Sequence, residues 1–158
     1  MRERFASGVS DAAAKTSIKV LNDNLALVID LSLIVKQAHW TLRGGGFIGV
    51  HELLDSAVGN LRNILDMIAE RAVILGGTPD GTSQTVAKQT SLPPYPADLI
   101  RLNDHVRELT ARYKIVAASV RDGIEATEED ADTADLLTEA SRIIDKDAWF
   151  IGSNVEGN

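Results

Sequence analysis

The distribution of proline is the sequence feature that most restricts the fold. All four prolines lie between Pro79 and Pro96, so the residues on either side are free to form long helices. Apolar residues recur every three or four positions in four stretches, 25–42, 50–75, 99–124 and 132–151. The connection 76–96 is too long for a tight helical hairpin, and a short helix is predicted inside it at 82–89. The sequence therefore predicts an all-α protein, a four-helix bundle with one long central crossover.

Composition indicates one soluble domain without thiol chemistry. The 158 residues suit a single bundle, expected at 16–158 after a mobile N-terminal tail at 1–15. The absence of cysteine excludes disulfides, thiolate metal sites and a cysteine nucleophile. A formal net charge of −7 argues against general binding of nucleic acid. Neither a membrane-spanning apolar run nor a signal peptide is recognisable, so no membrane association and a cytoplasmic location are expected.

Four potential metal ligands lie along the second predicted helix: His51, Asp55, Asp66 and Glu70. At ~100° per residue the last three lie at about 40°, about 60° and about 100° from His51, so all four share one narrow stripe. The apolar residues of this helix centre at about 280°, so the stripe lies away from the chain's own core. Gly59 shares the stripe, where a glycine that costs ~1 kcal/mol inside a helix suits the close approach of a second backbone.

Spacing along the helix separates these ligands into two pairs. Asp55 and Asp66 are ~16 Å apart, and His51 and Glu70 ~28 Å apart, so one metal ion cannot bind both pairs within one chain. Both pairs are centred on the same point, at residues 60–61. Antiparallel pairing of two copies about this point brings His51 of one chain to Glu70 of the other. The same pairing brings Asp55 to Asp66, which gives two equivalent shared sites.

Taken alone, each pair of neighbouring residues on the helix has a simpler explanation. His51 and Asp55 would form a hydrogen bond on the surface, and Asp66 and Glu70 would belong to a solvated acidic face. The common stripe and the common centre favour a metal site instead. A mixed shell of imidazole and carboxylate suits iron, manganese or zinc, and the share of carboxylates favours redox-capable iron over structural zinc.

Four runs closely resemble the Dps family of mini-ferritins, the DNA-protecting proteins of starved cells: KQAHW, GGFIGVHELLD, LDMIAERAVILGG and TADLLTEASRIIDKDAWF. The resemblance extends over about residues 22–151. It implies a ferritin-like four-helix bundle assembled into a hollow dodecamer. It also implies a ferroxidase, an enzyme that oxidises Fe(II) with hydrogen peroxide or oxygen, stores the ferric mineral and so protects DNA from oxidative damage.

The resemblance also assigns the metal ligands. His39, His51 and Asp55 of one subunit would join Asp66 and Glu70 of its two-fold mate in a ferroxidase centre that binds at most two iron ions. His39 enters only through the resemblance, because spacing alone does not place it.

Two tryptophans and one acidic turn each carry two interpretations. Trp40 and Trp149 are expected to pack in the core, whereas the resemblance places both near the ferroxidase centre as traps for stray radicals. Asp132, Asp135 and Glu139 share a face at the start of the last predicted helix, with Asp132 as its cap. By resemblance, the same three carboxylates would line a pore for iron uptake on a three-fold axis.

Two other conspicuous groups receive no functional role. His105 lies among charged residues and is expected to be exposed. The triglycine 44–46 is not a nucleotide-binding phosphate loop, because no strand precedes it and no Lys-Ser/Thr pair follows.

The chain departs from the family pattern at its two ends. Residues 1–20 hold only four basic residues, so DNA binding is expected to be weak or absent. Gly152 replaces a helix-forming residue, so the last helix is expected to fray early. Two other functions remain as alternatives: a nucleoid-structuring DNA-binding protein with secondary iron chemistry, and a helical oligomer with a vestigial or zinc-filled site.

Overall fold

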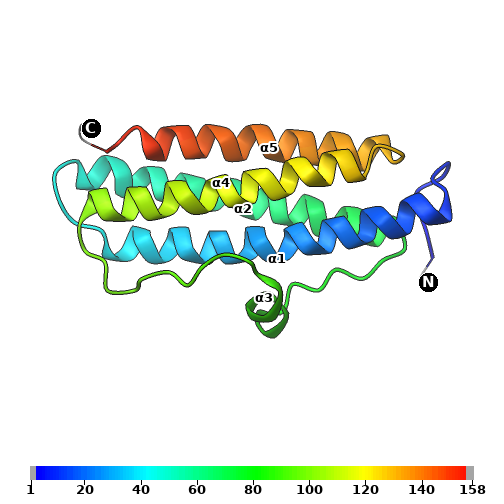
Figure 1. Ribbon diagram of the computed structural model, residues 1–158, viewed down its shortest axis with the longest axis horizontal. Coiled ribbons are helices and arrows are strands. Elements are labelled where there is room, and N and C mark those ends of the chain that lie inside the picture. Colours follow the sequence, from blue (N-terminus) through cyan, green and yellow to red (C-terminus); the bar gives the residue numbers. More distant parts are fainter. Residues whose placement is uncertain (1–2, 156–158) are drawn as a thin grey trace.

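A computed structural model describes residues 3–155, which form five helices: α1 (Asp11–Thr41), α2 (Phe47–Ile74), α3 (Ser83–Gln89), α4 (Leu102–Ala126) and α5 (Ala131–Gly152). The four long helices lie side by side, and α3 lies outside them against α1 (Figure 1). The connection that contains α3 runs back along the bundle, so α2 and α4 begin at the same end (Figure 1). This is the predicted all-α four-helix bundle, with its short helix in the central crossover.

The core is built from the apolar stripes of the four long helices. Each helix contributes side chains that are almost fully buried: Leu21, Leu31, Leu54, Leu61, Ile64, Leu109, Tyr113, Leu137 and Ile144. Helix α1 packs along α2, and α4 packs along α5, so each pair of neighbours in sequence forms one antiparallel half of the bundle.

Helix α1 begins earlier than the sequence predicts. Ser10 caps it by accepting a hydrogen bond from the N–H of Ala13, at 3.1 Å, and Ala13 and Ala14 are already buried. The predicted boundary of the tail at residue 15 is therefore wrong for residues 11–15. Residues 1–2 of that predicted tail lie outside the described residues.

Helix α5 also differs from expectation at both ends. Its cap is Asp130 rather than Asp132, since the Asp130 side chain accepts from the N–H of Thr133. The helix continues through Gly152 instead of fraying before it. A Cβ at Gly152 would lie 3.3 Å from the Thr110 hydroxyl, so the missing side chain lets the end of α5 approach α4 closely.

None of the helices within residues 3–155 combines the length and the apolar character that crossing a bilayer requires.

Candidate metal centre

Two imidazole rings meet where α1 ends and α2 begins. His39 lies in the last turn of α1 and His51 early in α2, and their rings stack with centroids 3.7 Å apart. The Nδ1 atom of His39 lies 2.8 Å from the carbonyl oxygen of His51, and the Nδ1 atom of His51 lies 2.9 Å from the carbonyl oxygen of His39. Because a carbonyl oxygen only accepts, both Nδ1 atoms carry the hydrogen. In the neutral rings both Nε2 atoms therefore keep the lone pair that a metal ion needs.

Asp55 follows His51 by one helical turn and lies close enough to both histidines for their charges, when the rings are protonated, to act on it. Its carboxylate is exposed and forms an ion pair with Lys36 of α1. The hydrogen bond and the charge of Lys36 hold the pKa of Asp55 below its usual value, and the two histidines add to this effect when they are protonated. The carboxylate is thus ionised at neutral pH, and a lysine competes for it.

Asp66 and Glu70 lie on the same helix beyond this cluster. Both are exposed, and neither has an ion-pair partner among residues 3–155. Within that range, a single chain gathers no group of three or more His, Asp or Glu side chains suited to a metal ion. One chain therefore brings His39, His51 and Asp55 into one region and leaves Asp66 and Glu70 apart from them.

The surface of α2 around Asp55, Asp66 and Glu70 is left uncovered by residues 3–155. The buried residues of α2 form the opposite stripe, as predicted: Val50, Leu54, Ala57, Val58, Leu61, Ile64, Ile68, Arg71 and Ala72. Gly59 is exposed on the uncovered side, where an added Cβ would meet nothing within 4 Å. No packing within the described residues explains a glycine at this point of a long helix.

Both tryptophans lie on the surface of the chain. Trp40 and Trp149 are each 67% exposed, so the prediction that they pack in the core is wrong for the single chain. Trp40 directly follows His39, and the indole of Trp149 rests against Phe150 with centroids 4.9 Å apart. Trp149 and the neighbouring exposed Phe150 form an apolar surface, and exposed apolar patches commonly mark contacts with a partner.

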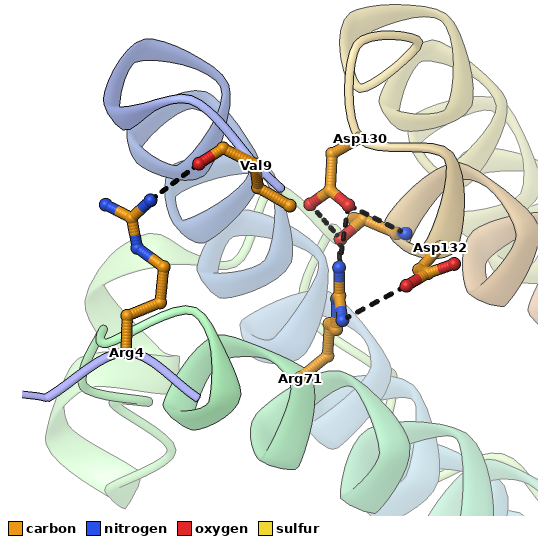
Figure 2. Close-up of polar contacts among 6 residues, drawn as sticks. Arg4, Val9, Arg71, Asp130 and Asp132 are labelled. Carbon is orange, nitrogen blue, oxygen red and sulfur yellow. Dashed lines mark hydrogen bonds and ion pairs between the residues drawn. The ribbon is translucent and has the colours of Figure 1, made fainter. Parts of the chain in front are cut away.

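The acidic residues at the start of α5 are exposed, but a buried ion pair lies directly behind them. Arg71 of α2 donates to Asp130 at 2.6 Å and to the Thr133 hydroxyl at 3.0 Å, while Asp132 lies 3.8 Å from the same guanidinium (Figure 2). Asp135 and Glu139 remain exposed on α5. Sequence reasoning missed Asp130, whose burial depends on an arginine far away in the sequence.

His105 is buried, contrary to the prediction that it is exposed. Its Nδ1 atom accepts from the Tyr95 hydroxyl at 2.6 Å, and its Nε2–H donates to the carbonyl oxygen of Leu99 at 3.0 Å. Burial is the main cause that lowers the pKa of His105. The residue ties the long connection to the start of α4, which is a structural role.

Comparisons with known proteins agree with this architecture. A family model described as Ferritin-like domain matches residues 18–157. The "DNA protection during starvation protein" of Agrobacterium fabrum is 48% identical over 91% of this chain and 90% of its own length. The protein of the same name from Mycolicibacterium smegmatis is 33% identical over 94% of this chain and 82% of its own.

Two solved structures show the same fold. "Mycobacterium smegmatis Dps tetragonal form" has a TM-score of 0.93 and 31% identity, covering 98% of this chain and 96% of its own. The Dps of Microbacterium arborescens "in the high iron form" has a TM-score of 0.88 and 30% identity, covering 94% of this chain and 97% of its own.

Proposed function

This chain belongs to the Dps family of ferritin-like proteins, and we propose that it oxidises Fe(II), stores the ferric product and thereby protects DNA. The observation that carries the proposal is the stacked pair His39 and His51. Each ring uses Nδ1 to hold the other's main chain, so both Nε2 atoms are available beside the ionised carboxylate of Asp55.

We propose that the site is completed by a second copy of the chain. Antiparallel pairing of α2 about residues 60–61 would bring Asp66 and Glu70 of one subunit to Asp55 and His51 of the other. The uncovered stripe and the exposed Gly59 support this pairing, since both are suited to the close approach of a second helix. Repetition of such dimers gives a homo-oligomer, for which we propose the hollow dodecamer that the family resemblance implies.

In the proposed reaction, iron is the substrate and hydrogen peroxide, or oxygen, is the oxidant. Two Fe(II) ions give one electron each to one peroxide molecule, its O–O bond breaks, and two protons complete two water molecules. The carboxylates neutralise and orient the cations, and the imidazoles supply neutral donors. Because both electrons arrive together, the one-electron product, the hydroxyl radical, is avoided.

The direct test is to measure the rate of Fe(II) oxidation by the assembled wild-type protein in a stopped-flow instrument. The rate is measured with peroxide under anaerobic conditions and with oxygen alone. We expect fast consumption of two Fe(II) per peroxide and a mineral that stays with the protein. Oxidation no faster than in protein-free buffer would contradict the proposed function.

The tryptophans have a proposed role beside this site. Trp40 adjoins His39, and the indole rings of Trp40 and Trp149 are oxidisable, so we propose that they intercept radicals that escape the centre. Replacement of both by phenylalanine should increase spin-trapped hydroxyl radical during turnover without slowing Fe(II) oxidation. An unchanged radical yield would leave them as surface contacts only.

Protection of DNA need not involve binding to it, and the charge disfavours binding. A net charge of −7 per chain, multiplied over a shell, repels a polyanion, and the N-terminal segment holds few cations. We propose a cytoplasmic protein that acts by removing iron and peroxide near the nucleoid. A gel shift with duplex DNA at ~0.15 M salt should show weak or no binding. Tight binding that is lost on deletion of residues 1–10 would favour the alternative role in structuring the nucleoid.

A further inference from the structure

The α1–α2 loop, the start of α4 and the end of α5 lie at one end of the bundle (Figure 1). Residues of the loop, of the start of α4 and of the segment after α5 line a cavity there. Its volume is about 490 Å³. It is separate from the metal centre, and the proposed iron chemistry gives it no role. The loop 44–46, the first turn of α4 and Asn154 form much of its wall.

Three arginines line this cavity although the chain as a whole is acidic. Arg43 comes from the loop and Arg101 and Arg107 from the start of α4. The single acid in the wall, Asp104, lies 4.0 Å from Arg107. Within residues 3–155, Arg43 and Arg101 form no ion pair. Among residues 3–155, the side chains that line the cavity therefore carry a net positive charge.

The main chain holds two of these arginines at paired positions. The N–H of Arg43 donates to the carbonyl oxygen of Ile100 at 2.8 Å, and the N–H of Leu102 donates to the carbonyl oxygen of Arg43 at 2.9 Å. This isolated bridge pairs Arg43 directly with Arg101. Since like charges on paired positions destabilise a fold, a bound anion would relieve the repulsion.

Hydrogen-bond donors from the backbone add to the arginines. Both α2 and α4 begin beside the cavity. Neither N-cap residue caps its helix with a side chain, because Gly46 has none and the guanidinium of Arg101 has no acceptor atom. The N–H of Asn103, which has no hydrogen-bond partner within residues 3–155, and the positive ends of two helix dipoles thus adjoin three guanidinium groups. A tetrahedral oxyanion with several acceptor oxygens matches such a set of donors.

We infer that this cavity binds phosphate, as the free inorganic anion. The triglycine in the wall is not the phosphate loop of a nucleotide-binding fold. The positive charge of this cavity comes from arginines, whereas such a loop uses a lysine. A DNA phosphodiester offers the same chemistry, but duplex DNA would also meet the repulsion of a chain with net charge −7. A small dianion brings only its own two negative charges, which the three arginines outnumber.

Gly45 provides a sharp test. Its φ is not in the left-handed region, and an added Cβ would meet nothing within 4 Å, so a side chain can be placed on the cavity wall without strain. Gly45→Asp introduces a negative charge there, and Gly45→Asn has nearly the same shape without the charge. The pair separates electrostatics from bulk.

The experiment is calorimetric titration of the assembled, iron-free protein with sodium phosphate at low ionic strength. We expect binding by wild type and Gly45→Asn, and at least about tenfold weaker binding by Gly45→Asp. Arg43→Gln with Arg101→Gln should weaken it similarly, whereas the control Lys114→Gln with Arg142→Gln, which removes two exposed cations elsewhere, should not. Absence of phosphate binding by wild type, or equal binding by Gly45→Asp, would overturn the inference.

A competition arm distinguishes the two sources of phosphate. Duplex DNA added to the phosphate-loaded protein should not displace the anion. Displacement by DNA, together with a gel shift that Gly45→Asp abolishes and Gly45→Asn keeps, would overturn the assignment to the free anion and make the cavity a contact for the DNA backbone.

Discussion

His39 and His51 lock each other in one orientation, because the Nδ1–H of each ring donates to the main-chain carbonyl oxygen of the other residue. The two bonds join the last turn of α1 to the first turns of α2 and leave the Nε2 atom of each ring without a partner in this pair. Metal-binding histidines commonly use their second nitrogen in this way, to fix the tautomer and the direction of the ligating one.

The first prediction concerns this pair and its neighbour. His39→Ala, His51→Ala and Asp55→Ala should each slow Fe(II) oxidation by peroxide by about tenfold or more, since each removes a donor that orients iron. Asp98→Asn, a change to an exposed carboxylate on the long connection, is the matched control and should have no effect. Wild-type rates in all three variants, with assembly verified by size-exclusion chromatography, would exclude this site.

The second prediction concerns the competition for Asp55. Lys36→Met removes the ammonium group that pairs with this carboxylate, so the pKa of Asp55 should rise towards its ordinary value. At pH 7 the carboxylate stays ionised and is free of its competitor, and anaerobic titration should show tighter Fe(II) binding than in wild type. Weaker binding would mean that Lys36 positions Asp55 for iron.

The third prediction concerns iron uptake. If Asp132, Asp135 and Glu139 line a pore, their field concentrates cations at its mouth. Replacement by Asn, Asn and Gln should slow mineral growth, most strongly at low ionic strength, and should affect oxidation of limiting iron less. Neutralisation of three exposed acids elsewhere, Asp23, Asp80 and Asp98, is the control. If both triple variants take up iron at the same rate, the acidic residues of α5 do not line a pore and are only solvated residues at the start of a helix.

The fourth prediction concerns pH and stability. Asp147 of α5 is buried and accepts from the Asn60 amide at 2.9 Å, but its second oxygen has no partner, and burial raises its pKa. When the pKa of an acid is higher in the folded state than in the unfolded state, the protein loses stability as the pH rises above the unfolded-state pKa. The loss of stability is complete once the pH exceeds the folded-state pKa. Asp147→Asn should therefore be more stable than wild type at pH 7, by about 1 kcal/mol, with little difference near pH 3.5. Thermal unfolding across that range measures this, and a less stable variant at pH 7 would contradict it.

Helical periodicity predicted most of the fold, because each apolar stripe is a local property of the chain. The long helices, the crossover and the uncovered face of α2 all follow from spacing. The burial of His105 could not be predicted, because its partner Tyr95 reaches it only in the folded chain. The role of Asp130 could not be predicted for the same reason, since its partner Arg71 is distant in the sequence.

The metal centre was partly predictable for the same reason. His51 and Asp55 share one helix, so spacing relates them, whereas His39 lies on another helix and needed the family resemblance. The exposure of Trp40 and Trp149 could not be read from residue type, since an indole that a partner covers has the same sequence signal as one in a core.

Each proposed iron site is shared between two chains, and subunit mixing is the most direct test of that sharing. One variant carries His51→Ala and Asp55→Ala, and the other carries Asp66→Ala and Glu70→Ala, so each homo-oligomer has only half-sites. A mixed dimer has one site without any of these four ligands and one site with all of them. Random pairing makes about half of the dimers mixed, so co-assembled particles should recover roughly a quarter of wild-type Fe(II) oxidation. Mixed particles, verified by mass spectrometry, that stay as inactive as their parents would contradict the shared site.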